Sequence, residues 1–426
     1  MKTLEDTHVV TCFLRNRGDV LLLRRSEAVG SYRGKWGTVA GYAEGSPEQA
    51  ATREIAEETG LGDSVELVRQ GESFPVEDEE LRKRWIVHPF LFECGSRDFK
   101  LDRESVEAEW VSPTEMLRRN TVPELWTSYA RVAPSVNSVS GDTEHGAAYI
   151  SLRALDVLRD RAALLAVERA EPGPAWNALA NTAVHLIEGH PSMAVLANRL
   201  NRVMHSCRKS RAAEAVEHQA HASIERAAAD DDAAAEHAAG LVAGHAVLTL
   251  SRSGTVLDAL RTAEPRPTRV AVAESRPGGE GVGVAERLAR AGLSVTLLPD
   301  AAIGALLEAG RVDLVLIGAD SLLPSGAVVN KVGSYAAALA AARAGIPFYA
   351  VSATDKLLAN DEEIQPGRGR IEELYRGSAP LDTFIPMFEP VPAELVTSVV
   401  TEKGVLGGSD LAAIATDLKK LADWSS

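Results

Sequence analysis

The sequence has little cysteine, few aromatic residues and no surplus of positive charge. Its three cysteines, Cys12, Cys94 and Cys207, stand far apart in a chain of 426 residues. This spacing argues against a disulfide framework or a cysteine-rich zinc site, and is typical of reduced thiols in a cytoplasmic protein. The formal net charge of −15 argues against direct binding to nucleic acids, because no excess of cations can replace phosphate counterions.

The sequence also lacks long apolar runs. None approaches the roughly 20 residues that a transmembrane helix needs, and the N-terminus lacks the basic-then-apolar order of a signal peptide. We therefore expect a cytoplasmic protein with no membrane partner. A hydrophobic content of 45% and a charged content of 25% are ordinary for a globular protein. Because a single core rarely grows beyond about 250–300 residues, this length predicts two or three domains.

The segment Pro47–Gly60 carries the most informative pattern. Its alanine-rich start and its terminal glycine predict a helix with a glycine cap. On such a helix Glu54, Glu57 and Glu58 share one face, because they are spaced at i, i+3 and i+4. One interpretation is a solvated acidic face on which Arg53 pairs with Glu57. The other is a metal site, because clustered carboxylates suit a hard divalent cation such as Mg²⁺ or Mn²⁺.

Residues 53–61 match the core of the Nudix box, Arg-Glu-apolar-x-Glu-Glu-x-Gly-apolar, at every position. The upstream stretch 34–45 resembles the loop that leads into this box. There is one departure from the pattern: Gly45 stands where the full box has a glutamate, and Glu44 is the candidate replacement. The chain is therefore similar to Nudix hydrolases, and the resemblance favours the metal site over the solvated face.

The resemblance covers residues 1–131 and implies an α/β/α sandwich with one catalytic helix. It implies that the carboxylates of Glu54, Glu57 and Glu58 bind Mg²⁺ or Mn²⁺, with Glu57 and Glu58 also counted as catalytic. Arg53 would orient these carboxylates. The expected activity is hydrolysis of a nucleoside diphosphate-type substrate.

The remaining pattern predicts how the chain is organised. Alternating apolar and polar residues predict strands around the helix at His8–Leu14, Val20–Arg24, Val65–Arg69 and Trp85–Glu93. Residues 132–145 are small, polar and without periodicity, which predicts an irregular linker. Residues 146–240 keep a helical period and predict a helical subdomain, with a new helix opening at Pro191.

Residues 241–426 alternate strands with amphipathic helices. The apolar strands are expected at His245–Leu250, Arg269–Glu274, Ser294–Pro299, Val312–Gly318, Pro347–Ser352 and Leu395–Thr401. Continuous apolar strands that alternate with helices predict a parallel sheet covered on both faces. In such sheets, ligands bind outside the carboxyl ends of the strands.

Polar residues gather at those predicted strand ends. They are Ser251, Ser253, Gly254, Arg276, Asp320, Asn330, Lys331 and Lys356. The loop Ser251–Thr255 opens a helix and offers backbone N–H groups and hydroxyls to a phosphate. Asn330 and Lys331 are expected at the start of the helix that follows Asp320. Any one of these residues alone would be an ordinary loop residue, but together they predict a pocket for a phosphorylated polyol.

This set resembles, in order and spacing, the family that unites the initiation factor 2B alpha, beta and delta subunits with sugar-phosphate isomerases. The resemblance runs from about His145 to the C-terminus and includes the segment Pro191–Asn198. The isomerase members act on methylthioribose 1-phosphate or ribose 1,5-bisphosphate. Family members associate through this domain, so we expect a homo-oligomer.

The resemblance implies roles for single residues. The family's substrate-binding positions fall on His145, Gly146, His190, Asn330 and Lys331. Its acid/base aspartate falls on Asp320, and its catalytic cysteine falls on Ser251. A serine hydroxyl is a far poorer proton acceptor than a thiolate, and histidine is not a permanently charged phosphate clamp as arginine is. The usual isomerase chemistry is therefore not expected.

The sequence thus predicts an α/β protein in which a Nudix sandwich precedes a helical subdomain and a Rossmann-like parallel-sheet domain. We expect a metal-dependent Nudix hydrolase fused to a domain that binds a phosphometabolite such as a ribose phosphate. One alternative is a pentose-phosphate aldose–ketose isomerase that uses Asp320 with an unrecognised base. The other is a non-enzymatic regulatory subunit of the initiation-factor-2B type.

Overall fold

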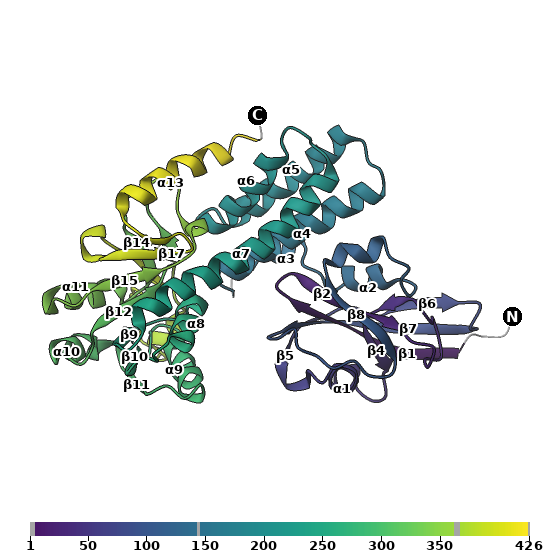
Figure 1. Cartoon of the computed structure of the whole chain (residues 1–426), viewed down its shortest axis with the longest axis horizontal. Coiled ribbons are helices and arrows are strands. Elements are labelled where there is room, and N and C mark those ends of the chain that lie inside the picture. Colours follow the sequence, from purple (N-terminus) through teal and green to yellow (C-terminus); the bar gives the residue numbers. More distant parts are fainter. Residues whose placement is uncertain (1–4, 143–144, 362–366, 425–426) are drawn as a thin grey trace. The chain divides into compact units, whose positions relative to one another are not determined.

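The computed structural model describes residues 5–142, 145–361 and 367–424 (Figure 1). These residues form two compact units. The first comprises the described residues before position 143 together with Leu152–Gly189 and Ser206–Glu225, and the second comprises His145–Ser151, His190–His205 and the described residues from Arg226 onward. The helices predicted as one subdomain are thus shared between the two units. Throughout the described parts, every helix is too short or too polar to span a bilayer.

The first unit is built on a mixed sheet, eight-stranded over the described residues, in which β3-β2-β1-β7-β5 form the main path. Its strands are β1 (Glu5–Asn16), β2 (Asp19–Arg25), β3 (Trp36–Gly37), β4 (Val39–Tyr42), β5 (Val65–Gln70), β6 (Phe74–Asp78), β7 (Lys83–Cys94) and β8 (Ser105–Val111). The predicted hairpin is confirmed, since β1 and β2 pair antiparallel around the turn at Gly18. The predicted strands within β5 and β7 are confirmed as well.

Helices cover both faces of this sheet. On one face, α1 (Pro47–Thr59) buries Ala50, Ala51 and Ile55 against β1, β2 and β7. On the other face, α2 (Leu125–Ala130) buries Leu125 and Tyr129 in a second apolar cluster. The arrangement is the α/β/α sandwich that the sequence predicts.

The stretch predicted as a linker contains a short helix, α3 (Val136–Ser140), that the sequence did not predict. The cause is a capping box: the Ser135 hydroxyl accepts the backbone N–H of Ser138, and the Ser138 hydroxyl accepts the N–H of Ser135. Such reciprocal bonds satisfy the free N–H groups of a first helical turn without any apolar period.

Four long helices follow, as the periodicity predicts. They are α4 (Ala147–Val167), α5 (Pro172–Gly189), α6 (Ala194–Cys207) and α7 (Ala213–Val242). Pro172 occupies the first position of α5, where its missing N–H costs no helical hydrogen bond. The prediction that Pro191 opens a helix is off by three residues, because α6 begins at Ala194 after a turn.

The second unit contains a sheet in the order β11-β10-β9-β12-β15-β17-β18, all parallel except β18. Its strands are β9 (Ala246–Thr249), β10 (Arg269–Ala273), β11 (Val295–Leu298), β12 (Leu314–Gly318), β15 (Phe348–Val351), β17 (Ser398–Thr401) and β18 (Gly404–Leu406). By order of appearance the six parallel strands run 3-2-1-4-5-6, which is the doubly wound Rossmann order. The predicted parallel sheet is confirmed.

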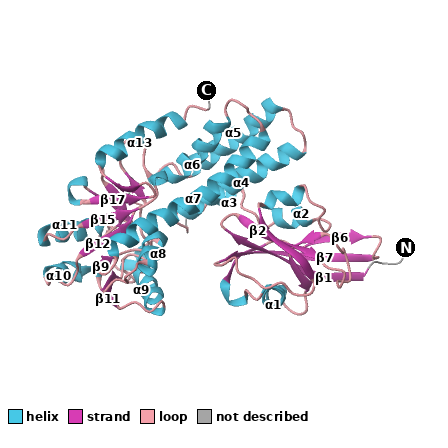
Figure 2. Ribbon diagram, in the orientation of Figure 1, coloured by secondary structure: helices cyan, strands magenta, loops and turns pink. Residues whose placement is uncertain are grey.

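Helices lie on both faces of this second sheet, as Figure 2 shows for α8 and α9 on one side and α10 and α11 on the other. The helices that follow the strands are α8 (Gly254–Thr262), α9 (Glu280–Arg290), α10 (Ile303–Glu308), α11 (Ser334–Ala344) and α13 (Gly408–Leu421). The apolar clusters on the two faces are separate, with α7, α8 and α9 in one and α10, α11 and α13 in the other.

A small antiparallel sheet, three-stranded in the part of the chain that is described, was not anticipated. It consists of β13 (Ser321–Leu322), β14 (Val328–Lys331) and β16 (Phe388–Val391), and the short α12 (Ile371–Leu374) precedes β16. Asn330 and Lys331 therefore end a strand, whereas the sequence placed them at the start of a helix. That helix, α11, begins three residues later at Ser334.

Candidate functional site

The acidic helix α1 is fixed at its C-terminal end by a glycine. Gly60 has a φ of 70°, in the left-handed region that favours glycine, and its N–H donates to the carbonyl of Ala56. The glycine cap predicted from the sequence is confirmed. Because Ile55 and the two buried alanines lie against the sheet, the carboxylates of the helix are carried at its flank.

Glu54 lies directly over Gly41 of β4. A Cβ atom at Gly41 would come within 2.1 Å of the Glu54 carboxyl carbon, so only glycine leaves room for this carboxylate. Arg53 holds Glu54 in place, with its Nη2 3.1 Å from Glu54 Oε1 and 3.3 Å from the carbonyl oxygen of Tyr42. Arg53 thus pairs with Glu54, and the alternative pair with Glu57 is not formed.

Glu58 is buried and accepts a hydrogen bond of 3.1 Å from the backbone N–H of Ala40. Burial raises the pKa of Glu58 to about 8, and the negative charges of Asp102, Glu104 and Glu54 add to the shift while the Ala40 bond opposes it. A carboxyl group crowded by other carboxylates in this way is an environment that a bound cation would stabilise. Glu57, by contrast, is exposed.

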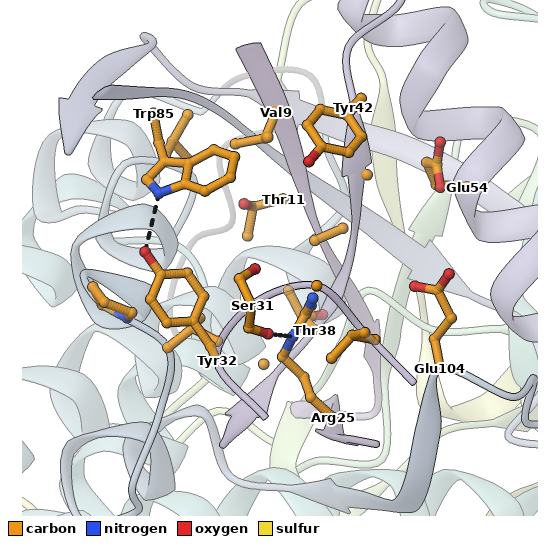
Figure 3. Close-up of a pocket in the computed structure, with 18 of the residues that line it drawn as sticks. Val9, Thr11, Arg25, Ser31, Tyr32, Thr38, Tyr42, Glu54, Trp85 and Glu104 are labelled. Carbon is orange, nitrogen blue, oxygen red and sulfur yellow. Dashed lines mark hydrogen bonds between the residues drawn. The ribbon is translucent and has the colours of Figure 1, made fainter. Parts of the chain in front are cut away.

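A cavity of about 730 Å³ lies beside these carboxylates (Figure 3). This volume is within the range of small-molecule sites. Glu54 and Glu104 lie at one side of the cavity, Tyr32 and Trp85 lie at the other side, and Tyr42 lies between Trp85 and Glu54. Tyr32, Tyr42 and Trp85 form an aromatic wall of the cavity, and Glu44 and Lys83 also line it.

The aromatic wall is held by hydrogen bonds. Trp85 Nε1 donates to the Tyr32 hydroxyl over 3.0 Å, and that hydroxyl donates to the carboxylate of Asp78. Burial, with the Asp78 bond and charge, raises the pKa of Tyr32, so it stays a neutral donor. Lys83 Nζ lies 4.7 Å from the Trp85 ring centre and 5.7 Å from that of Tyr42. The wall therefore presents aromatic faces and one cation.

The donor set at the acidic side fits a hard divalent cation in kind, because it consists of carboxylate oxygens. Within residues 5–142, 145–361 and 367–424, no three acidic, histidine or cysteine side chains converge closely enough to hold an ion as they stand. Of the three glutamates predicted as ligands, Glu54 lines the cavity, Glu58 is buried behind it and Glu57 faces solvent.

A second group of residues meets at the carboxyl edge of the second sheet, between β9 and β12. Ser251 has a φ of 66°, and its N–H donates over 2.7 Å to the hydroxyl of Ser275. Ser253 caps α8 by accepting the N–H of Val256. A Cβ at Gly318, the last residue of β12, would come within 2.6 Å of Ser253 Cβ, so the two loops touch. Chain order reverses at this position in the sheet, which is where doubly wound folds bind ligands.

Asp320 lies at the same edge, just after β12, and is partly buried. Burial raises the pKa of Asp320, while the charges of Lys356 and Lys331 oppose the shift and Glu280 adds to it. Lys356 Nζ donates over 2.7 Å to the carbonyl of Ala319, and Lys331 Nζ lies 2.9 Å from Glu280. The charges of two lysines therefore act on the aspartate of this site.

Three other residues predicted to bind the ligand, Asn330, Arg276 and Gly254, have local roles in the structure. Asn330 is buried and donates to the Ser334 hydroxyl over 2.9 Å. The backbone N–H of Arg276 donates to Asp300, its side chain is exposed, and Gly254 opens α8.

The two predicted histidines lie on other loops. His145, next to Gly146 and before α4, is exposed and stacks on Tyr149 with 4.2 Å between the ring centres. His190 lies in the turn before α6, where its carbonyl accepts the N–H of Met193. Neither histidine is among the groups whose charge acts on Asp320.

Comparisons with known proteins find matches for both parts of the chain. Residues 143–408 match the initiation factor 2 subunit family, and residues 6–132 match the NUDIX domain. The chain is 33% identical over 230 residues to a methylthioribose-1-phosphate isomerase of Chloroflexus aurantiacus, covering 48% of this chain and 66% of that protein. It is 41% identical over 174 residues to a probable bifunctional methylthioribose-1-phosphate isomerase/methylthioribulose-1-phosphate dehydratase of Nocardia farcinica, covering 38% of this chain and 32% of that protein. The matches thus span 32% to 66% of the length of these relatives, which is less than two thirds.

Solved structures show the same fold at lower identity. The translation initiation factor eIF-2B of Pyrococcus horikoshii is 24% identical with a TM-score of 0.54, over 64% of this chain and 94% of that chain. The 5-methylthioribose 1-phosphate isomerase of Pyrococcus horikoshii is 19% identical with a TM-score of 0.53, over 76% of this chain and 90% of that chain.

Proposed function

The chain belongs to the initiation factor 2 subunit family and is an enzyme with a NUDIX domain of the pyrophosphohydrolase class; we propose that it hydrolyses a nucleoside diphosphate-type substrate with a divalent cation. The observation that carries this proposal is the carboxylate flank of α1 beside a cavity of about 730 Å³. Acidic side chains at one side suit the metal-bound diphosphate, and the aromatic wall suits a planar organic group.

We assign the metal to Glu54, Glu57 and Glu58, with Mg²⁺ or Mn²⁺ as the ion. When bound, the cation neutralises the diphosphate and lowers the pKa of an attacking water. Arg53 holds the Glu54 carboxylate over Gly41 through the bonds described above, and the Ala40 N–H holds one oxygen of Glu58. Because Glu57 is exposed, its side chain has to turn towards the other two for all three to share one ion.

The test is a screen of the purified full chain against nucleoside diphosphate derivatives with Mg²⁺ or with Mn²⁺. We expect at least one compound to be split at its diphosphate bond, and chelation by EDTA to stop the reaction. Finding every compound intact with both ions would contradict the proposal.

For the second site we propose binding of a phosphorylated pentose. The observation that favours it is the position of Asp320 at the switch point of the sheet, where the charges of Lys331 and Lys356 act on it. An anion would be held by the lysines and by the N–H groups that open α8. Calorimetric titration with ribose phosphates tests this binding, and absence of heat at millimolar ligand would contradict it.

A specific observation also favours aldose–ketose isomerisation at this site. Relatives 33–41% identical to this chain bear the name methylthioribose-1-phosphate isomerase. Burial raises the pKa of Asp320, the direction that helps a carboxyl group to act as a general acid as well as a base. Ser251 is the obstacle, because a hydroxyl does not replace a thiolate. An assay with pentose 1-phosphates separates an isomerase from a domain that only binds.

Two further features are proposals as well. We propose a homo-oligomer formed through the second unit, since a similar fold is seen in a tetrameric eIF2B complex of Chaetomium thermophilum. Light scattering of the purified chain tests this, and a monomer at micromolar concentration would refute it. We place the chain in the cytoplasm because its three cysteines are all buried and free. Stable capture of an initiation factor without any turnover would instead favour the regulatory alternative.

A further inference from the structure

Lys356, whose ammonium group belongs to the second site, is carried by a single helical turn. The turn, Thr354–Lys356, follows β15 at the carboxyl edge of the second sheet, and we name it the lysine turn. Lys356 Nζ donates over 2.7 Å to the carbonyl oxygen of Ala319, the residue before Asp320. The place of this positive charge in the site therefore depends on what holds the lysine turn.

One amide group holds the backbone on both sides of Lys356. Nδ2 of Asn198, on α6, donates over 2.8 Å to the carbonyl oxygen of Asp355 and over 2.7 Å to that of Leu357. Asn198, Asp355 and Leu357 are all buried. A side-chain amide supplies two N–H donors from one uncharged nitrogen, so Asn198 satisfies the two backbone acceptors that flank the lysine.

Two arginines of the same helix hold the side chain of Asp355. Arg199 Nε lies 3.1 Å from one carboxylate oxygen, and Arg202 Nη1 lies 2.6 Å from the other. Burial alone would raise the pKa of Asp355, but the charges of Arg202 and Arg199 and their hydrogen bonds lower it. Arg199 also donates over 2.8 Å to the hydroxyl of Ser151 on α4. The residue before Lys356 is thus an ionised carboxylate clamped by α6.

The beginning of the lysine turn is attached elsewhere. The backbone N–H and the hydroxyl of Thr354 both donate to the carboxylate of Glu402, the N–H over 2.9 Å. Glu402 directly follows β17, so this attachment does not involve α6. Removing the amide of Asn198 should therefore loosen the end of the turn, where Lys356 lies, while its beginning stays in place.

We propose that Asn198 is a positioning residue of the second site, which together with the Arg199–Asp355 pair holds the ammonium group of Lys356 where it binds the anionic group of a ligand. The proposal rests on the proposed sugar-phosphate site and adds to it a residue from outside the strand ends. A cation that is held in place before binding loses little conformational freedom when the ligand arrives, so more of its attraction is expressed as affinity.

The physical reason for the effect lies in the two carbonyls. Without the Asn198 amide, the buried carbonyl groups of Asp355 and Leu357 lose a donor, and an unsatisfied buried acceptor is unfavourable. Conformations of the turn in which water reaches these carbonyls are then favoured, and they carry Lys356 away from Ala319.

The test compares two asparagines of α6. Asn198→Ala removes the contact with the lysine turn, and Asn201→Ala is the matched control, because Asn201 Oδ1 accepts the Trp424 Nε1 hydrogen bond over 2.8 Å instead. Calorimetric titration of the full chain with ribose 5-phosphate gives the dissociation constant. We expect Asn198→Ala to raise it at least about tenfold and the control to raise it less than about twofold. Equal losses in the two variants, or wild-type affinity in Asn198→Ala, would overturn the proposal.

A double-mutant cycle with Lys356→Met shows whether the effect passes through the lysine. On the Lys356→Met background, Asn198→Ala should change the dissociation constant by less than about twofold, because the group that it positions is gone. A tenfold loss on that background would show that Asn198 acts by another route, and would overturn the proposal.

Acetylation of lysines, measured residue by residue with mass spectrometry, follows Lys356 without any ligand. Asn198→Ala should raise the acetylation rate of Lys356 at least about threefold, because a loosened turn exposes the amine more often, and Asn201→Ala should not. Lys331, whose side chain is 3% exposed, is the internal reference and should react at the wild-type rate in both variants. An unchanged rate at Lys356, or an equal rise at Lys331, would overturn the proposal.

The two readouts separate this proposal from the one on which it rests. If the wild type binds no ribose 5-phosphate while the acetylation of Lys356 responds as expected, the sugar-phosphate proposal fails and the positioning of the lysine stands. If the wild type binds the ligand and Asn198→Ala changes neither the acetylation nor the dissociation constant, the positioning role fails alone.

Discussion

A buried network of charges in the first unit allows a sharp prediction. Asp156 of α4 is fully buried, and its oxygens lie 2.9 Å from Arg159, 3.1 Å from Arg153 and 3.8 Å from Arg15. Two of these arginines come from the same helix, while Arg15 is the last residue but one of β1 in the sandwich. Asp156→Asn keeps the size of the side chain and removes the anion that the three cations share.

The magnitude follows from the count of charges. The network holds three arginines and three carboxylates, since Glu93 pairs with Arg15 and Asp160 pairs with Arg159. After the substitution three buried cations face two anions, and removing one partner of a buried pair typically costs about 3–5 kcal/mol. We expect the free energy of unfolding of this unit to fall by that amount.

The assay is urea denaturation of the full chain, followed by tryptophan fluorescence. Glu168→Gln, an exposed site just beyond α4, is the control and should change the unfolding free energy by less than about 0.5 kcal/mol. A loss below about 1 kcal/mol for Asp156→Asn would refute the reasoning, because it would mean that water or a relaxed backbone screens the three arginines.

Three further predictions concern the cavity, another carboxyl group of the charge network and the second site. Gly41→Ala should lower hydrolytic turnover at least about tenfold with the fold intact, because the new Cβ displaces the carboxylate of Glu54. Wild-type turnover in this variant would contradict the placement of that carboxylate. Burial raises the pKa of Asp160 to about 6, although the charge of Arg159 opposes the rise. Because this carboxyl group loses its proton at a lower pH in the unfolded chain than in the folded one, the unfolding free energy should fall by about 2–3 kcal/mol as the pH rises from 4 to 6.5. Asp160→Asn should flatten that part of the stability profile, and an unchanged slope would exclude this group as its source. In the second site, the double substitution His145→Arg and His190→Arg should tighten ribose phosphate binding about tenfold in calorimetry, since arginine is a permanent bidentate anion donor; equal or weaker binding would remove both histidines from the phosphate site.

The elements that a local pattern specifies could be predicted from the sequence. The hairpin of β1 and β2, the glycine-capped α1 and the alternation of strands and helices after Leu241 all follow from apolar periods and turn residues within a few positions. The strand ends were located well enough to name Ser251, Asp320 and Lys356, which the structure brings to one edge.

The features that depend on distant partners could not be predicted. β13, β14 and β16 are two to four residues long, and β14 pairs with β16 across more than fifty residues, so neither has a local period. The sequence also could not predict which glutamate of α1 is buried, because the spacing i, i+3 and i+4 does not say on which side of the helix the sheet lies.

The central claim is that the acidic flank of α1 performs metal-dependent hydrolysis. It is tested most directly by turnover of the substrate found in the screen, at saturating Mg²⁺, for the three separate variants Glu54→Gln, Glu57→Gln and Glu58→Gln. Glu48→Gln, an exposed acidic residue in the first turn of α1, is the control. Each of the three should lose more than about 100-fold in kcat, since even groups that only orient metal ligands are worth about 10- to 100-fold, and the control should keep its rate. Wild-type turnover in all three variants, or an equal loss in the control, would contradict the claim.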